Sequence, residues 1–257
     1  MPRLIPTALA VSAIPLCAFP VVVHAQGTGQ FHATVRGEYS NIDAGGGSSG
    51  DLWLGGLGAT VDFGSGFGAQ GDVEFGTLDV TGLDKDLWGV GAGVFLRDLG
   101  SSSSRLGAGV QYYDASNGAS LDVTYYGLAG EGYLSDMFTL AARGGAFSRS
   151  PGSDGYYLGG EGSVYPFPNL ALNLNLDYVD FDSGGDITDF GAEIEALPFN
   201  TIPISVYGGY DRADFSGGGD WDVWTIGLKA YLGAAGDGTL VSHHRQEVLR
   251  FAPKFRF

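Results

Sequence analysis

The chain has almost no cysteine, since Cys17 is the only one among 257 residues. It lies in an apolar N-terminal stretch, and Leu16 precedes it where lipoprotein signals carry Gly or Ala. We therefore interpret Cys17 as a small apolar residue of a leader segment. A mature chain without cysteine excludes a disulfide framework and thiol chemistry.

Long hydrophobic runs are also missing. After the N-terminal stretch, no apolar run approaches the roughly 20 residues that a transmembrane helix needs. The stretch itself has one base, Arg3, then apolar residues interrupted by Pro15 and Pro20, and the small-residue exit Val23-His24-Ala25. This order is typical of a cleaved secretory signal peptide, and the prolines disfavour a permanent membrane anchor. We predict a signal peptide over residues 1–25.

Charged residues make up only 16% of the chain, whereas glycine is abundant, with 45 residues. No Gly-X-Y period indicates collagen, and the apolar content is too high for a disordered chain. The charge balance is acidic, with a net charge of −16. An exported acidic chain without a helical pattern indicates an all-β protein, and nothing in it suggests nucleic-acid binding.

The strongest positive signal is alternation of apolar and polar residues with a period of two. In 169–178, leucines occupy one face, and Asn173, Asn175 and Asp177 occupy the other. Twelve segments show such a pattern: 30–41, 51–63, 67–78, 86–97, 105–114, 121–134, 138–149, 155–165, 169–181, 187–197, 202–212 and 220–233. Many are 10–13 residues long, which suits a tilted strand crossing a bilayer (about 9–11 residues) better than a soluble strand (about 5–6). The sequence predicts a closed antiparallel up-and-down transmembrane β-barrel of about twelve strands.

Connections between the segments alternate in character. One set, such as 43–50 and 182–186, is longer and rich in Gly, Ser and Asp, whereas the other, such as 64–66 and 135–137, is mostly tight. Outer-membrane barrels have long extracellular loops and short periplasmic turns, so we expect the first set outside the cell and both termini in the periplasm. Aromatic residues near the segment ends are expected to form interfacial girdles: Trp53, Phe63, Phe67, Trp88, Phe138, Tyr156, Phe181, Trp221 and Trp224.

On these features the chain resembles Gram-negative outer-membrane barrel proteins of the porin-like class. The resemblance is architectural and covers nearly all of the mature chain, with no specific family motif. It implies a location in the bacterial outer membrane, contact with its lipid and lipopolysaccharide, and handling by the barrel-assembly machinery. Thr225, Gly227 and Leu232 have a spacing similar to the terminal-strand assembly signal, from which Ala230 departs. The oligomeric state stays open.

Alternation also assigns a lumen-facing polar set. We predict that these residues line the pore: Arg36, Glu38, Asp62, Asp72, Glu74, Arg97, Glu131, Arg143, Arg149, Glu161, Asn173, Asn175, Asp177, Glu193, Glu195 and Lys229. A dry interior would make so many ionisable groups costly unless they were paired. The lumen is therefore either wet or densely cross-linked by ion pairs. In a conducting path, the surplus of acids would favour cations.

Two segments carry separate hypotheses. Residues 234–257 form a periplasmic C-terminal tail, after the signal peptide and the barrel at 26–233, and carry a net positive charge. The tail either blocks the periplasmic mouth, contacts a partner or is disordered. Four acids around a Gly-Gly turn, Asp180, Asp182, Asp186 and Asp189, are the candidate ligands for Ca²⁺ or Mg²⁺; solvated turn acids are the alternative. No other cofactor is expected.

Three function classes follow. The first is a passive diffusion channel favouring small cationic or neutral solutes. The second is a structural or surface-interaction barrel with an occluded lumen. The third is an outer-membrane hydrolase, which we do not expect, because His32, His243 and His244 are the only mature-chain histidines and none falls near the outer rim.

Overall fold

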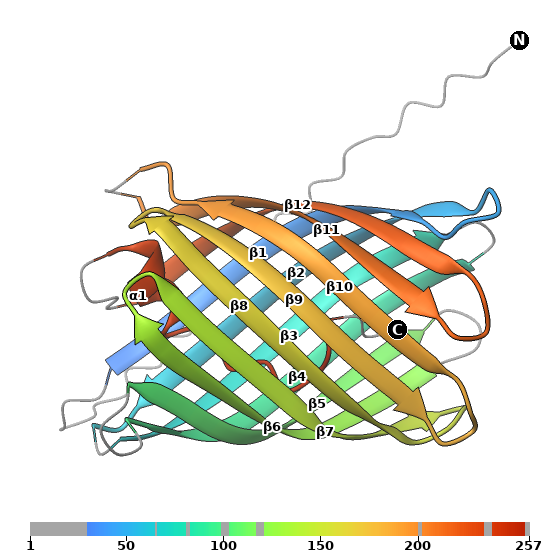
Figure 1. Cartoon of the computed structure of the whole chain (residues 1–257), viewed down its shortest axis with the longest axis horizontal. Coiled ribbons are helices and arrows are strands. Elements are labelled where there is room, and N and C mark those ends of the chain that lie inside the picture. Colours follow the sequence, from blue (N-terminus) through green and yellow to red (C-terminus); the bar gives the residue numbers. More distant parts are fainter. Residues whose placement is uncertain are drawn as a thin grey trace, which may run out of the picture.

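The computed structural model describes residues 30–64, 66–80, 83–98, 103–116, 121–199, 202–233 and 238–254. The predicted signal peptide lies outside these ranges. Twelve antiparallel strands form a closed barrel in which sequential strands are neighbours and the first pairs with the last (Figure 1). The elements are β1 (Gln30–Asp43), β2 (Ser49–Asp62), β3 (Phe67–Val80), β4 (Leu83–Arg97), β5 (Ser104–Ser116), β6 (Leu121–Ser135), β7 (Phe138–Ser150), β8 (Gly155–Phe167), β9 (Leu170–Phe181), β10 (Asp186–Ala196), β11 (Ile204–Phe215), β12 (Asp220–Gly233) and one short helix, α1 (Leu240–His244).

Each predicted segment coincides with one strand, so the predicted fold is confirmed. The strands are 11 to 15 residues long, and none of the described helices is long and apolar enough to cross a membrane. Strand β1 begins and strand β12 ends at the same end of the barrel, which is called here the turn end. The opposite end, which carries the connections after β1, β3, β5, β7, β9 and β11, is called the loop end.

The predicted difference in connection length is small in the structure. Strand pairing extends into the Gly- and Asp-rich segments, as in the cross-strand pairs Asp43↔Ser49 and Asp79↔Asp84. The connection between β1 and β2 is therefore only 44–48, whereas that between β10 and β11, at the turn end, is 197–203. Connection length consequently does not distinguish the two ends.

The outer face of the barrel is apolar all the way round. On β9, Leu172, Leu174 and Leu176 are 41–61% exposed, whereas the alternating Asn175 and Asp177 are buried on the inside. Comparable outward side chains recur on every strand, for example Val94 on β4 and Leu128 on β6. A continuous exposed apolar surface of this extent is unsuited to water and suited to lipid.

Aromatic side chains mark the outer face near both ends. Toward the loop end, Trp53 packs on Tyr39 with ring centroids 4.7 Å apart, and Trp224 packs on Tyr210 at 4.8 Å. Further pairs on this face are Trp88–Tyr112 and Tyr156–Tyr178, with Phe63–Phe67 at the turn end. This arrangement fits interfacial girdles. Two of the expected girdle residues, Phe181 and Trp221, instead pack inside against the apolar clusters of the lumen.

Candidate functional site

The C-terminal segment 238–254, called here the tail segment, lies inside the barrel (Figure 1). It begins with α1 at the turn end. The hydroxyl of Thr239 accepts a hydrogen bond from the Ser242 amide and caps this helix. Leu240 is fully buried in a cluster with Tyr165, Tyr231 and other lumen residues. This part of the predicted C-terminal tail therefore packs against the inner wall of the barrel.

Side chains of the wall hold the backbone of the tail segment. The amide of Gln70 donates to the Leu249 carbonyl at 2.7 Å and accepts from the Leu249 N–H at 2.9 Å. The hydroxyl of Thr60 donates to the Gln246 carbonyl at 2.8 Å. These bonds satisfy backbone groups that would otherwise be buried without a partner, which is costly.

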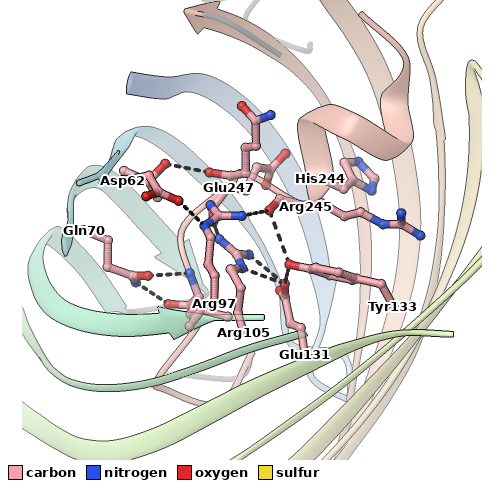
Figure 2. A network of polar contacts seen from close by, with 12 residues as sticks. Asp62, Gln70, Arg97, Arg105, Glu131, Tyr133, His244, Arg245 and Glu247 are labelled. Carbon is pink, nitrogen blue, oxygen red and sulfur yellow. Dashed lines mark hydrogen bonds and ion pairs between the residues drawn. The ribbon is translucent and has the colours of Figure 1, made fainter. Parts of the chain in front are cut away.

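Two arginines on neighbouring strands bind the same stretch (Figure 2). Arg97 and Arg105 are cross-strand partners, an arrangement that like charges disfavour. Asp62 pairs with Arg97 at 2.9 Å and Glu131 with Arg105 at 2.7 Å. Each arginine also donates to a tail carbonyl: Arg97 to that of residue 245 at 3.2 Å, and Arg105 to that of Glu247 at 2.6 Å. The tail carbonyls therefore accept hydrogen bonds from two arginines whose like charges lie side by side.

The opposite wall, β8–β11, is acidic. Its inward side chains in the described structure include six carboxylates: Glu161, Asp177, Asp189, Glu193, Glu195 and Asp211. Bases of the tail segment face them. Lys254 pairs with Asp211 at 2.8 Å, and Arg250 approaches Glu161 at 3.8 Å. The backbone N–H of Lys254 also donates to Asp177. The opposite sign of the tail, visible in the sequence, is thus matched to this wall.

Glu195 is the most densely bonded of these acids, and it is fully buried. Its carboxylate accepts from Ser205, from Tyr231 and from Lys229 at 2.9 Å. His244 of α1 also contacts it at 3.1 Å. Burial alone would lower the pKa of His244, but the Glu195 carboxylate outweighs this and raises that pKa above its usual value of 6.5. Glu195 therefore links strands β10, β11 and β12 to helix α1 at the turn end.

Phe251 sits in a recess made by glycines. A Cβ at Gly93 or at Gly109 would lie 2.3 Å from its ring, so only glycine leaves space for the ring there. The hydroxyl of Tyr157 donates to the Phe251 carbonyl, and the next residue, Ala252, is fully buried in an apolar cluster. The wall therefore matches the tail segment in three respects: hydrogen bonds to its backbone, opposite charge, and shape.

Three cavities lie between the tail segment and the wall. Their volumes are about 160 Å³, 110 Å³ and 70 Å³, and Arg250 lines all three. Each has room for a few water molecules. Hydrogen bonds and ion pairs therefore join the tail segment to the wall on both sides of these cavities.

The residues that alternation assigns to the lumen are on the inner wall, mostly in pairs. The described contacts are Arg36–Glu74, Glu38–Tyr207, Asp62–Arg97, Asp72–Gln111, Glu131–Arg105, Arg143–Asp177 and –Glu161, Asn173–Glu193, Asn175–Asp189, and Glu195–Lys229. Arg149 lies over the Phe181 ring at 5.7 Å.

The four candidate metal ligands do not converge. Asp180 and Asp186 are cross-strand partners, and Asp182 lies in the connection between their strands. Asp189 instead faces the lumen and accepts a hydrogen bond from Asn175 at 3.1 Å. Within the described residues, no group of three or more His, Cys, Asp or Glu side chains is arranged to hold a metal ion.

Several lumen residues were not identified from the sequence. Arg105, almost fully buried, lies at the start of a predicted segment, and Asp211 lies at the end of another. Both lie within predicted segments, and the alternation of those segments places them on the inner face. Gln70 lies on the polar face that alternation assigns to 67–77 but was not in the predicted set, and Lys85 was assigned to a connection, although both face inward and are buried.

The sequence matches no protein-family model and no curated protein. Solved structures do match the fold. The NanC porin has a TM-score of 0.56 at 13% identity, with 78% of this chain and all of that chain covered. The KdgM porin has a TM-score of 0.55 at 13% identity, covering 77% and 98%. An outer-membrane channel from Pseudomonas putida F1 has a TM-score of 0.55 at 13% identity, covering 79% and 96%. The chain therefore has the fold of outer-membrane porins and channels.

Proposed function

We propose that the protein is a porin-like channel of the bacterial outer membrane that its own tail segment closes. When the tail segment leaves, the lumen passes small cationic or neutral solutes. The observation that carries the proposal is the position of the tail segment, which lies in the lumen and is held there by noncovalent contacts such as those of Gln70 and Thr60. The barrel has an apolar outer surface that suits lipid and a charged interior, and a membrane channel has both features.

The preference for cations follows from the acidic wall. With the tail segment in place, Lys254 and Arg250 lie against Asp211 and Glu161. Once these bases leave, that wall keeps carboxylates that attract cations and repel anions. Neutral solutes are limited by the width of the lumen only. The tail segment thus supplies bases that neutralise part of the acidic wall.

Orientation and surroundings belong to the same proposal. The even strand number brings β1 and β12 to one end, which we place in the periplasm, with the Gly- and Asp-rich loop end outside. The outer surface would contact lipid and lipopolysaccharide, and the barrel-assembly machinery would insert the chain.

A disulfide lock tests the closure. A Cβ on Gly58 would lie 3.9 Å from the Cβ of Val248, within the range of about 3.5–4.5 Å that disulfides adopt. The double variant Gly58→Cys/Val248→Cys can therefore fix the tail segment to β2, in a mature chain predicted to contain no other cysteine. Each single cysteine variant is the control.

Conductance is measured in planar bilayers under oxidising and reducing conditions. We expect the reduced double variant to open and to give a cation-selective reversal potential in a salt gradient. The oxidised form should stay closed, and a reductant should restore opening. Equal, large conductance in both states would show that the tail segment is not in the path.

An occluded structural barrel is the second candidate, because the contacts of the tail segment are extensive and buried. It predicts silence in both redox states and also in a chain truncated after Gly233 that still folds. A hydrolytic role is not proposed, because His32, His243 and His244 all lie at the turn end, which this proposal places in the periplasm, and none lies near the outer rim.

A further inference from the structure

The loop end of the lumen is lined by apolar side chains, in contrast to the charged middle. Six of these residues surround one cavity: Leu78, Leu121, Phe181, Ile187, Phe215 and Trp221. We call this region the apolar vestibule. It comes from strands all around the barrel, because the two apolar clusters to which these residues belong or pack include members from β1 to β12. An aqueous ion path does not require such a lining.

The cavity of the apolar vestibule has a volume of about 470 Å³, which lies within the range of about 300–1,000 Å³ typical of small-molecule sites. Ligand sites are mostly apolar with a few polar groups that fix orientation. This cavity has that composition, since its polar side chains are few beside its apolar lining. Its size is sufficient for an aromatic ring with a short substituent.

Three charged side chains line the cavity, of which two are basic, Arg149 and Lys85, and one is acidic, Asp186. Arg149 lines the cavity, and its guanidinium lies 5.7 Å from the centre of the Phe181 ring. The buried Nε of Arg149 has no hydrogen-bond partner in the described structure, and a buried donor without a partner is costly. Lys85, which is 8% exposed, lines the same cavity. A ligand carboxylate in the cavity would bring counter-charge to the guanidinium of Arg149.

The apolar vestibule also touches the tail segment. A second cavity, of about 160 Å³, is lined by Leu78 and Trp221 as well and reaches down to Lys254. Ala252 packs in the apolar cluster that contains Tyr125 and Tyr157. A molecule bound in the vestibule would therefore lie above the end of the tail segment.

We propose that the apolar vestibule is a binding site for small aromatic carboxylates. The ring lies among Phe181, Phe215 and Trp221, and the carboxylate pairs with Arg149. This inference does not depend on conduction, because binding requires only the cavity and its lining.

Trp221 provides the assay. It lines the cavity, whereas Trp53, Trp88 and Trp224 are 46–62% exposed on the outer face. A variant in which these three are replaced by Phe leaves Trp221 as the only tryptophan of the chain. The probe is 4-bromobenzoate, whose bromine quenches indole fluorescence on contact. The matched probes are 4-bromobenzylammonium and neutral 4-bromobenzyl alcohol.

We expect saturable quenching by 4-bromobenzoate and at least about tenfold weaker binding of the ammonium probe, since a favourable ion pair at a partly buried site is replaced by a repulsive one. Arg149→Gln should weaken the carboxylate about tenfold and leave the alcohol unchanged. Arg212→Gln is the control, because Arg212 faces outward and pairs with Asp214 at 3.0 Å.

Unsaturable quenching, or equal affinity for the carboxylate and the ammonium, would overturn the proposal. The comparison of probes uses the unaltered lining, so it holds even if Arg149→Gln does not fold. Saturable binding in a protein whose lumen never conducts would support this site and reject the channel, which keeps the two proposals distinguishable.

Discussion

Replacing Gln70 with Ala should release the tail segment while leaving the barrel intact. Gln70 lies on β3 and makes two hydrogen bonds to the backbone of Leu249, at 2.7 Å and 2.9 Å. The substitution leaves a buried carbonyl and a buried N–H of the tail segment without partners. Each such group costs about 1–3 kcal/mol, so docking should weaken by at least about 2 kcal/mol. That is roughly a 30-fold rise in the released fraction.

The assay measures the reaction of a thiol that only the released state exposes. Ala252 is fully buried near the inner end of the tail segment, and Ala252→Cys adds one small apolar atom in a mature chain predicted to have no other cysteine. When opening is fast compared with labelling, the rate of modification by a small maleimide is proportional to the released fraction. We expect labelling in the Gln70→Ala background to be about 30-fold faster than in the parent.

Gln111→Ala is the matched control. Gln111 is the same residue type, also buried in the lumen, but its amide donates to Asp72 at 3.2 Å and not to the tail segment. Its labelling rate should stay within about threefold of the parent. If Gln70→Ala and Gln111→Ala labelled equally, the Gln70 amide would not hold the tail segment, and the reasoning would be refuted.

Three further predictions concern stability, pH and membrane depth. Glu195→Gln removes the buried counter-charge of Lys229 and His244 and should lower the free energy of unfolding by about 3 kcal/mol. Denaturant titration in lipid vesicles measures this change. Asp136 is fully exposed, so Asp136→Asn should leave the unfolding midpoint unchanged. His244 is faced by Glu195, Lys229, Glu247 and the Tyr165 hydroxyl, and it holds its proton more tightly when the tail segment is docked. Docking should therefore be strongest below pH 6.5 and weaken as the pH rises through the raised pKa of His244. The labelling rate at Ala252→Cys should rise over the same pH range, and His244→Gln should abolish this pH dependence. In single-tryptophan variants, brominated lipid should quench Trp53, Trp88 and Trp224 but not Trp221; quenching of Trp221 would contradict its inward position.

The strands could be predicted because their signal is local. Leu172, Asn173 and Leu174 show which face meets lipid without any knowledge of the rest of the chain. The same signal fades toward the loop end, because Tyr178 outside and Val179 inside are both apolar. Alternation therefore revealed the charged middle of the lumen and missed the apolar vestibule.

The position of the tail segment was beyond this kind of reasoning. Its contacts join residues far apart in sequence, as between Gln70 and Leu249, 179 positions apart, and 238–254 has neither strand alternation nor a long helix. The one signal was its opposite charge. Charge alone left a plug, a partner-binding segment and disorder equally open; the glycine recess at Gly93 and Gly109 is visible only in three dimensions.

In the proposed channel, closure and cation selectivity would depend on the same residues of the acidic wall. Asp211 pairs with Lys254 at 2.8 Å when the tail segment is docked. In the open lumen, the same carboxylate would face passing ions. Asp211→Asn should therefore raise the opening frequency and also lower the cation preference, measured as the reversal potential in a salt gradient.

Gln70→Ala separates the two effects, because Gln70 is uncharged and binds only the backbone of the tail segment. It should raise the opening frequency and leave the reversal potential unchanged. Asp214→Asn, an exposed acid paired with Arg212 on the outer face, should change neither quantity. If Asp211→Asn shifted the reversal potential no more than Gln70→Ala, the acidic wall would hold the tail segment without lining the path of the ions, because a carboxylate beside that path must alter the free energy of a passing cation.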